Sequence, residues 1–318
     1  MNKQIQLLFP LLLVLLFFPG CDNRRTLIIF HAGSLTRPFE HLRRIFMEEH
    51  PEIQVVCEGA GSRACCRKIT DLARYADIVA SADYLVFEDL LMPEYADWYL
   101  KFATSRMVLA FDSHSKHGME ITSDNWHEIL AREGVEFGHS DPDLDPAGYR
   151  ALLCWKLADI HYGRTGENSI FARLNARCPP ENIRPGSMGL IALLQNFGLD
   201  YAFEYEAAAK QHHLQFVQLP PEVDLGSKEL ADFYAQVGLE ISGKRSGTKT
   251  MVRATPVQYA VTIPKDARNI SAAEAFLELL MSERGIKVME DNFQPVIYPA
   301  VPNDLSLIPE KLKKYCEQ

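Results

Sequence analysis

Short apolar runs and longer amphipathic stretches alternate along most of the chain. The runs have the length of strands, and some lack the polar-apolar alternation of a half-exposed strand, as in Thr26–Phe30. Continuous apolarity is typical of parallel strands, because both of their faces are covered. The alternation therefore predicts an α/β fold built on parallel sheet. The expected strands are 27–30, 54–58, 78–81, 107–111, 136–139, 200–205 and 258–264, and the main expected helices are 38–50, 63–75, 126–132, 149–162, 187–196 and 272–281.

Two of these strands predict a fold with two lobes. Strand 107–111 leads away from the first group of strands, and strand 258–264 returns to it. We therefore expect residues 27–110 and 258–318 to form lobe 1, and residues 111–257 to form lobe 2. Two crossings between the lobes make a hinge, on which a cleft can close around a ligand.

Four of the predicted helices begin at a turn marked by glycine or proline. One such turn is routine in an α/β protein. The first amides of a helix have no partner within it and lie at the positive end of its dipole, so they suit an oxyanion. Four such turns at the carboxyl ends of strands therefore predict an anion-binding cleft. The turns are Gly33-Ser34, Gly59-Ala60-Gly61-Ser62, Pro146-Ala147-Gly148 and Gly186-Ser187-Met188-Gly189.

The first twenty residues have the pattern of a secretory signal. Lys3 precedes an apolar run over residues 7–18, which is shorter than the ~20 residues that a membrane-spanning helix needs. The small residue before Cys21 resembles the bacterial lipobox. We expect residues 1–20 to be removed, Cys21 to carry a lipid anchor, and residues 21–26 to form a tether. The mature protein would then be held to a membrane of the cell envelope on its extracytoplasmic side. An ordinary signal peptide with an incidental cysteine is the alternative.

Composition narrows the classes of function. The formal net charge of −9 argues against a nucleic-acid partner and makes the capture of an anion depend on local groups. The six cysteines after Cys21 have no spacing typical of a zinc site. The chain has no Gly-x-Ser-x-Gly, His-Glu-x-x-His or P-loop motif, and the sequence indicates no catalytic partner for Ser34 or Ser62. We expect a binding protein without a cofactor rather than an enzyme.

Five segments carry a resemblance to a known family. Over essentially the whole mature chain, the sequence resembles the extracytoplasmic molybdate/tungstate-binding proteins of ABC importers, and most closely their tungstate-type branch. The resemblance implies a two-lobed periplasmic-binding-protein fold of class II type, with tungstate or molybdate as ligand. It also implies an ABC permease and its ATPase subunit as partners, and we expect a monomer. The segments are His31-Ala32-Gly33-Ser34-Leu35, Gly61-Ser62 with Arg67-Lys68-Ile69, Ala76-Asp77-Ile78-Val79-Ala80, Asp145-Pro146-Ala147-Gly148-Tyr149-Arg150 and Asp200-Tyr201-Ala202-Phe203-Glu204-Tyr205.

The resemblance further implies which residues bind the ligand. Ser34 and Ser62 would hydrogen-bond oxygens of the oxyanion from the first lobe. Backbone amides near Ala147 and Ser187 would do so from the second lobe. Two acidic residues match the carboxylates that approach the metal itself in the tungstate-type branch, and these are Asp145 and Glu204.

A carboxylate beside a doubly charged oxyanion needs a physical reason, because the two repel each other. The carboxyl group can be protonated, with a raised pKa. Alternatively, it can donate an oxygen to a high-valent metal and complete an octahedron, which sulfur in sulfate does not allow. Interpretations without a ligand stay open, with Asp145 as a helix cap and Glu204 as an exposed strand residue. Asp141 and Asp143 are the nearby alternatives to Asp145.

Other ligands also stay open. Tyr149, Tyr201 and Tyr205 could suggest a ferric-binding protein, although they fall at positions typical of a core. A sulfate-binding protein and a sensory ligand-binding domain are further alternatives. The sequence does not rank tungstate over molybdate, because the two ions have nearly the same size and charge. His31 lies beside the first turn, where we expect a hydrogen-bonded structural histidine.

Overall fold

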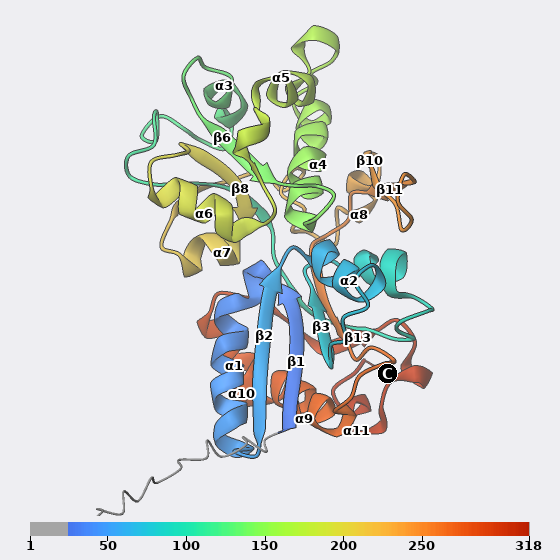
Figure 1. Ribbon diagram of the computed structural model, residues 1–318. Coiled ribbons are helices and arrows are strands. Elements are labelled where there is room, and N and C mark those ends of the chain that lie inside the picture. Colours follow the sequence, from blue (N-terminus) through green and yellow to red (C-terminus); the bar gives the residue numbers. More distant parts are fainter. Residues whose placement is uncertain (1–24, 318) are drawn as a thin grey trace, which may run out of the picture.

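The computed structural model describes residues 25–317, which form two lobes, one above the other in Figure 1. The lower lobe contains a six-stranded sheet with the strand order β13-β4-β12-β3-β1-β2. The upper lobe contains a five-stranded sheet with the order β7-β6-β8-β5-β9. Helices cover both sheets, so the architecture agrees with the predicted α/β class. The predicted signal peptide and Cys21 lie outside the described residues.

The first lobe is assembled from the two ends of the described chain. Its strands are β1 (Arg25–Ala32), β2 (Ile53–Ala60), β3 (Ile78–Ser81), β4 (Leu100–Thr104), β12 (Gln258–Thr262) and β13 (Val296–Pro302). Its helices are α1 (Thr36–Glu49), α2 (Ser62–Thr70), α9 (Ile270–Met281), α10 (Glu283–Asp291) and α11 (Glu310–Lys313), with the short turns η1 (Gly33–Leu35), η2 (Phe87–Leu91) and η5 (Leu305–Leu307).

The second lobe is assembled from the middle of the chain. Its strands are β5 (Met107–Phe111), β6 (Phe137–Ser140), β7 (Ile183–Arg184), β8 (Tyr201–Tyr205) and β9 (Gln215–Gln218), and β10 (Gly238–Ser242) and β11 (Lys249–Arg253) form a separate hairpin. Its helices are α3 (Trp126–Leu130), α4 (Pro146–His161), α5 (Ile170–Arg177), α6 (Ser187–Gln195), α7 (Glu206–Gln211) and α8 (Ala231–Tyr234), with the turns η3 (Gly166–Asn168) and η4 (Pro180–Asn182).

The chain crosses between the two sheets twice. The first crossing lies between β4 and β5, because β5 pairs with β8 and β9 in the upper sheet. It therefore falls a few residues before the boundary at residue 110 expected from the sequence. The second crossing precedes β12, which pairs with β3 and β4 in the lower sheet.

The sheets are mixed rather than purely parallel. In the first sheet, β1 pairs in parallel with both β2 and β3, as the apolar runs predict. The next strand, β12, is antiparallel to β3, because it returns from the second lobe and enters the sheet from the opposite end. The second sheet is mixed as well, because β6 and β8 pair in parallel whereas β5 is antiparallel to both of its neighbours, β8 and β9.

The helix predicted over 63–75 ends at Thr70. The N–H of Asp71 still donates to the carbonyl of Arg67, but Ala73 then takes a positive φ of 50°. A left-handed residue interrupts the helical path, so the chain turns towards β3 instead of continuing the helix.

Each lobe has its own aromatic packing. In the first, Phe39 and Phe46 of α1 lie against Phe276 of α9, with ring centroids 6.0 and 5.4 Å apart. In the second, Trp126 and Trp155 pack edge-on against the Phe203 ring, at 5.7 and 5.5 Å. Two such centres let each lobe keep its structure while the angle between the lobes changes.

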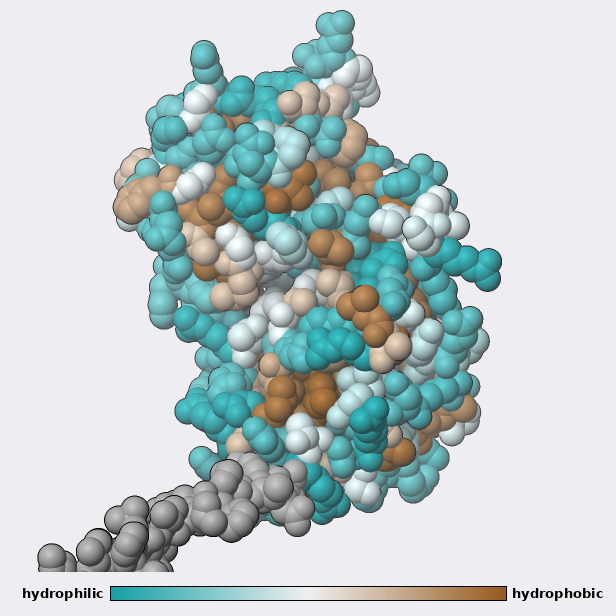
Figure 2. Space-filling view, viewed as in Figure 1, coloured by the Kyte–Doolittle hydropathy of each residue, from teal (hydrophilic) through white to brown (hydrophobic). Residues whose placement is uncertain are grey.

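The surface reflects this division. Figure 2 shows a continuous surface that is indented on its left side between the upper and lower parts, with pale residues of intermediate hydropathy near the middle of this face. Within residues 25–317, no helix combines the length and the apolar character needed to cross a membrane.

Candidate functional site

Four helix starts meet where the lobes touch. η1 and α2 follow β1 and β2 of the first lobe, whereas α4 and α6 follow β6 and β7 of the second. α6 lies against η1 across the join. The four turns singled out in the sequence are therefore brought to one place, and their unpaired first amides can act on one ligand.

The two lobes approach each other closely at Gly61. A Cβ atom on this residue would lie 2.4 Å from the carbonyl oxygen of Leu144 and 2.9 Å from Cβ of Asp145. The N–H of Ala64, one turn into α2, donates to the same carbonyl of Leu144 at 3.1 Å. Only glycine leaves room for this backbone-to-backbone contact, so the start of α2 docks directly on the loop before α4.

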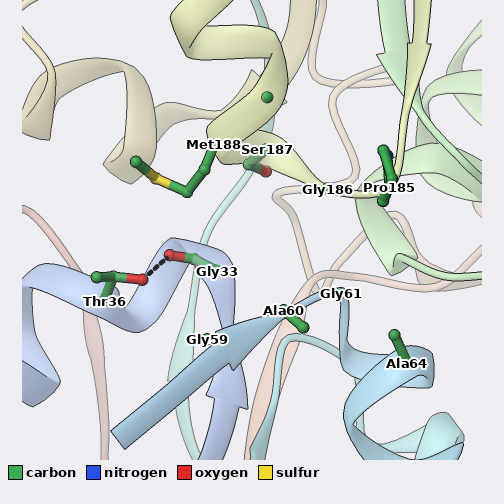
Figure 3. Close-up of a pocket in the computed structure, with 11 residues that line it drawn as sticks. Gly33, Thr36, Gly59, Ala60, Gly61, Ala64, Pro185, Gly186, Ser187 and Met188 are labelled. Atoms are coloured by element: carbon green, nitrogen blue, oxygen red, sulfur yellow. Dashed lines mark hydrogen bonds between the residues drawn. The ribbon is translucent and has the colours of Figure 1, made fainter.

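A cavity of about 300 Å³ opens at this junction. Figure 3 shows its two walls, with Gly33, Thr36, Gly59, Ala60 and Gly61 from the first lobe facing Pro185, Gly186, Ser187 and Met188 from the second. The walls carry no charged side chain, and of the predicted binding residues only Ser187 lines them. The other predicted residues are buried behind this cavity, so we interpret it as the approach to the site.

Asp145 lies between the wall of the cavity and the start of α4. Its Oδ1 accepts a hydrogen bond from the N–H of Ala147 at 3.0 Å, and its Oδ2 lies 3.2 Å from the position of a Cβ on Gly186. Burial raises the pKa of Asp145 to about 6, and the N–H groups of Ala147 and Ser187 oppose the rise. Asp145 therefore caps α4, which agrees with one of the two interpretations of the sequence. The cap uses Oδ1 and does not involve Oδ2.

The two neighbouring aspartates have other partners. Oδ1 of Asp141 accepts from the N–H of Asp143 at 2.8 Å, within the turn before α4. Oδ1 of Asp143 accepts from the N–H of Ser242 in the β10–β11 hairpin at 2.6 Å. Both side chains are partly exposed, whereas Asp145 is buried.

Glu204 is completely buried on β8, and this excludes the interpretation as an exposed strand residue. Neither of its carboxyl oxygens has a hydrogen-bond partner within residues 25–317. Burial raises its pKa to about 8; the nearby Ser187 hydroxyl opposes the rise without making a well-formed hydrogen bond, and the charge of Asp145 adds to it. A buried carboxyl group without a donor is unfavourable in its charged form, which agrees with the raised pKa of Glu204.

The two predicted serines lie on the first-lobe side of the site. Oγ of Ser34 and the hydroxyl of Tyr259 are 2.9 Å apart, and either can donate. Oγ of Ser62 accepts from the N–H of Ala82 at 2.9 Å. Because Ser62 acts as an acceptor there, its own hydroxyl hydrogen is left to donate to another acceptor.

The comparison with known proteins shows the family of this chain. Residues 27–293 match the model of the bacterial extracellular solute-binding proteins. The chain belongs to that family. The resemblance found in the sequence and the two-lobed fold that it implies are both confirmed.

Individual relatives cover almost the whole chain. A solute-binding protein of Petrotoga mobilis, described as uncharacterized, is 43% identical over 294 residues, which are 92% of this chain and 91% of the relative. The molybdate/tungstate-binding protein WtpA of Thermococcus kodakarensis is 37% identical over 351 residues, 100% and 98% of the two chains. The solved structure of the sulfate-binding protein SubI of Mycobacterium tuberculosis has a TM-score of 0.62 at 14% identity, over 86% of this chain and 87% of its own, and shows the shared fold alone.

The three tyrosines that could suggest a ferric site each have a hydrogen-bond partner within the protein. The hydroxyl of Tyr149 donates to Asp83 at 2.6 Å, that of Tyr201 donates to the carbonyl of Lys116, and that of Tyr205 accepts from Arg150 at 2.7 Å. Within residues 25–317, no three His, Cys, Asp or Glu side chains gather as a metal cluster. The hydroxyls of Tyr149 and Tyr205 thus end on the ion pair of Arg150 and Asp83, whereas that of Tyr201 contacts Lys116.

His31 is structural, as expected. Its Nδ1 donates to the carbonyl of Ala32 at 2.9 Å, and its ring lies 5.4 Å from that of Phe39. Burial lowers the pKa of His31, so the ring is neutral near pH 7.

The sequence analysis did not assign a role to Arg150. It lies on α4, whose residues 146–155 are all buried, and its own side chain is only 2% exposed. A charged residue inside such a helix needs a partner of opposite charge. An arginine within an otherwise apolar helical stretch was therefore the feature of the sequence that could have indicated a buried ion pair. Its partner, Asp83, belongs to the other lobe.

Proposed function

We propose that this protein binds tungstate or molybdate outside the cytoplasm and delivers it to an ABC permease with its ATPase subunit. The observation that carries the proposal is Glu204, a fully buried carboxyl group that has no donor among residues 25–317 and interacts with the charge of Asp145. The identity of 37% with a molybdate/tungstate-binding protein over the whole chain supports it.

In the proposed site, neutral dipoles hold the oxygens of the ligand. Ser34 and Ser62 would donate from the first lobe. The amides of Ala147 and Ser187, which face Asp145 in this structure, would donate to the ligand from the second lobe. Helix N-termini of this kind attract anions without a counter-charge, so no arginine has to touch the ligand.

The two carboxylates supply selectivity. Next to sulfate they would be like charges in a poorly hydrated site, which opposes binding. Tungsten and molybdenum accept further hard oxygen donors, and Asp145 and Glu204 would provide them from the second lobe. The same pair of residues would thus favour one class of oxyanion and disfavour another.

Calorimetric titration with tungstate, molybdate, sulfate and ferric citrate tests the proposal. We expect tight binding of the first two and little heat from the others. Binding of only sulfate or ferric iron would contradict it and would support one of the alternative ligands.

The variants Asp145→Asn and Glu204→Gln test the role of the carboxylates, because each keeps size but weakens donation to a metal. If both are ligands, tungstate affinity falls, by about tenfold or more for each, while discrimination against sulfate shrinks. Asp141→Asn is the matched control, since Asp141 is already engaged in its own turn. A uniform gain in affinity for both anions would show that the carboxylates only repel.

We also propose that Cys21 carries a lipid anchor after removal of residues 1–20. The support is the apolar run over residues 7–18 with Gly20 directly before the cysteine, and membership of a family of extracellular binding proteins. The anchor would keep the protein close to its permease.

A further inference from the structure

Arg150 extends from the second lobe into the first. Its Nη1 donates to the carbonyl of Ala82 at 2.8 Å, and its Nη2 lies 2.9 Å from Oδ2 of Asp83. Ala82 and Asp83 directly follow β3 in the sheet of the first lobe. On its own lobe, Nη1 also donates to the hydroxyl of Tyr205 at 2.7 Å.

This ion pair is fully enclosed. The side chains of Arg150 and Asp83 are 2% and 1% exposed. The hydroxyl of Tyr149 donates to the same Oδ2 at 2.6 Å, and the N–H of Leu85 donates to Oδ1 at 3.1 Å. A buried charge without a partner is strongly unfavourable, so each member of the pair depends on the other lobe being in place.

The same contact reaches one of the proposed ligand-binding serines. Ala82 accepts from Arg150 through its carbonyl, and its N–H donates to Oγ of Ser62. Arg150 therefore holds the peptide segment that orients Ser62 and also joins the lobes. Nη1 donates to two protein oxygens, and Nη2 forms the ion pair with Asp83.

We propose that Arg150 is a positioning residue that locks the closed lobes: its buried pair with Asp83 forms on closure and holds Ser62 in its binding orientation. This inference rests on the proposed function, because it assigns the residue a part in retaining the oxyanion. When the lobes separate, Arg150 and Asp83 lie on different lobes and are hydrated separately. The pair therefore affects the release of the ligand more than the stability of either lobe.

Arg150→Met tests this, with Arg132→Met as the matched control. Arg132 is on the same lobe and pairs with Glu120 at 2.8 Å, but at the surface. We expect Arg150→Met to weaken tungstate binding about 10- to 100-fold, mainly by faster release in stopped-flow experiments. Arg132→Met should change it by no more than about twofold. The melting temperature of the ligand-free protein should stay close to the wild-type value for both.

A double-mutant cycle with Asp83→Asn separates a lock between lobes from a role inside one lobe. We expect the combined loss of affinity to be smaller than the product of the single losses, by a factor of about five or more. Tyr149→Phe, which removes a donor to Asp83 but no charge, should cost less than Arg150→Met. If Arg150→Met does not fold, Arg150→Lys takes its place. It should also release tungstate faster than the wild type, because a single ammonium group cannot contact Ala82, Asp83 and Tyr205 in the way that the two terminal nitrogens of arginine do.

The outcomes are distinct. A wild-type affinity for tungstate in Arg150→Met, or losses that multiply independently, would overturn the lock and leave the proposed function intact. Failure of the wild-type protein to bind tungstate or molybdate would overturn the proposed function and this inference with it.

Discussion

At the scale of single residues, two histidines hold equivalent places, one in each lobe. His31 and His139 are the penultimate residues of β1 and β6, and Nδ1 of His139 donates to the carbonyl of Ser140 at 2.7 Å, as His31 does to Ala32. The ring of His139 lies 5.4 Å from that of Trp155. Burial lowers the pKa of both histidines, because the charged ring would lose its hydration.

These histidines should make stability depend on pH in the mildly acidic range. At each of these two positions the unfolded chain takes up a proton near pH 6.5, before the folded protein does, so each histidine lowers the free energy of unfolding as the pH drops below 6.5. Asp145 and Glu204, whose pKa values are raised, act in the opposite direction, so the contribution of a histidine is read from the difference between its variant and the wild type. Each histidine contributes a slope of up to about 1.4 kcal/mol per pH unit. His139→Gln keeps a donor for Ser140 but does not titrate, so its stability should fall less steeply.

Urea unfolding of the ligand-free protein at pH 7.0, 6.0 and 5.0 provides the measurement. The control is His41→Gln, a replacement of an exposed histidine. It should leave the dependence of the unfolding free energy on pH as in the wild type. An identical slope for His139→Gln and the wild type would contradict the assignment of His139 as a buried neutral residue.

At the scale of elements, the start of α2 and the loop before α4 form a tight junction between the lobes. Gly61 allows it, because any side chain would overlap the carbonyl of Leu144. Gly61→Ala should therefore hinder closure while leaving each lobe folded. We expect tungstate affinity to fall by about tenfold or more, since overpacking of this kind costs about 1–3 kcal/mol.

Gly33→Ala is the comparison for this effect. Its Cβ would meet only the carbonyl oxygen of Ala60 at 3.9 Å, an ordinary contact. We expect Gly33→Ala to bind tungstate at least several-fold more tightly than Gly61→Ala. Small-angle scattering with tungstate should show a larger radius of gyration for Gly61→Ala than for the wild type. Equal affinities for the two variants would indicate that the lobes need not approach this closely.

At the scale of the whole molecule, the cleft and the start of the described chain lie at opposite ends of the first lobe. The carboxyl ends of β1 and β2 face the second lobe, and β1 begins at the far end (Figure 1). An anchor at Cys21, four residues before β1, would therefore attach the protein away from its cleft. The lobes would be free to open and close while the protein stays at the membrane.

Cys21→Ser should abolish this attachment. We expect the variant to lose labelling by a radioactive fatty acid and to leave the membrane fraction, or to stay uncleaved. Cys57→Ser, a change at a partly buried cysteine of β2, should keep both labelling and fractionation. Labelled, membrane-bound Cys21→Ser protein would show that the lipobox assignment is wrong.

The sequence by itself determined the local units of this protein. Apolar runs such as Thr26–Phe30 and turns such as Gly33-Ser34 depend on neighbouring residues, so β1, η1 and the start of α1 were predictable. The same holds for Asp145 before Pro146, a pattern that caps a helix wherever it occurs. Family resemblance then indicated the solute-binding fold and which of these units face the ligand.

Only the tertiary structure decided how those units depend on one another. The antiparallel entry of β12 and the addition of β13 require the chain to return from the second lobe, which no local pattern encodes. Folding removes water from groups that are distant in the chain. For this reason Glu204 has no donor among residues 25–317, and Arg150 pairs with Asp83, which is 67 positions away in the sequence. A sequence shows that a charged residue is present, but its partner and the loss of its hydration are set by packing.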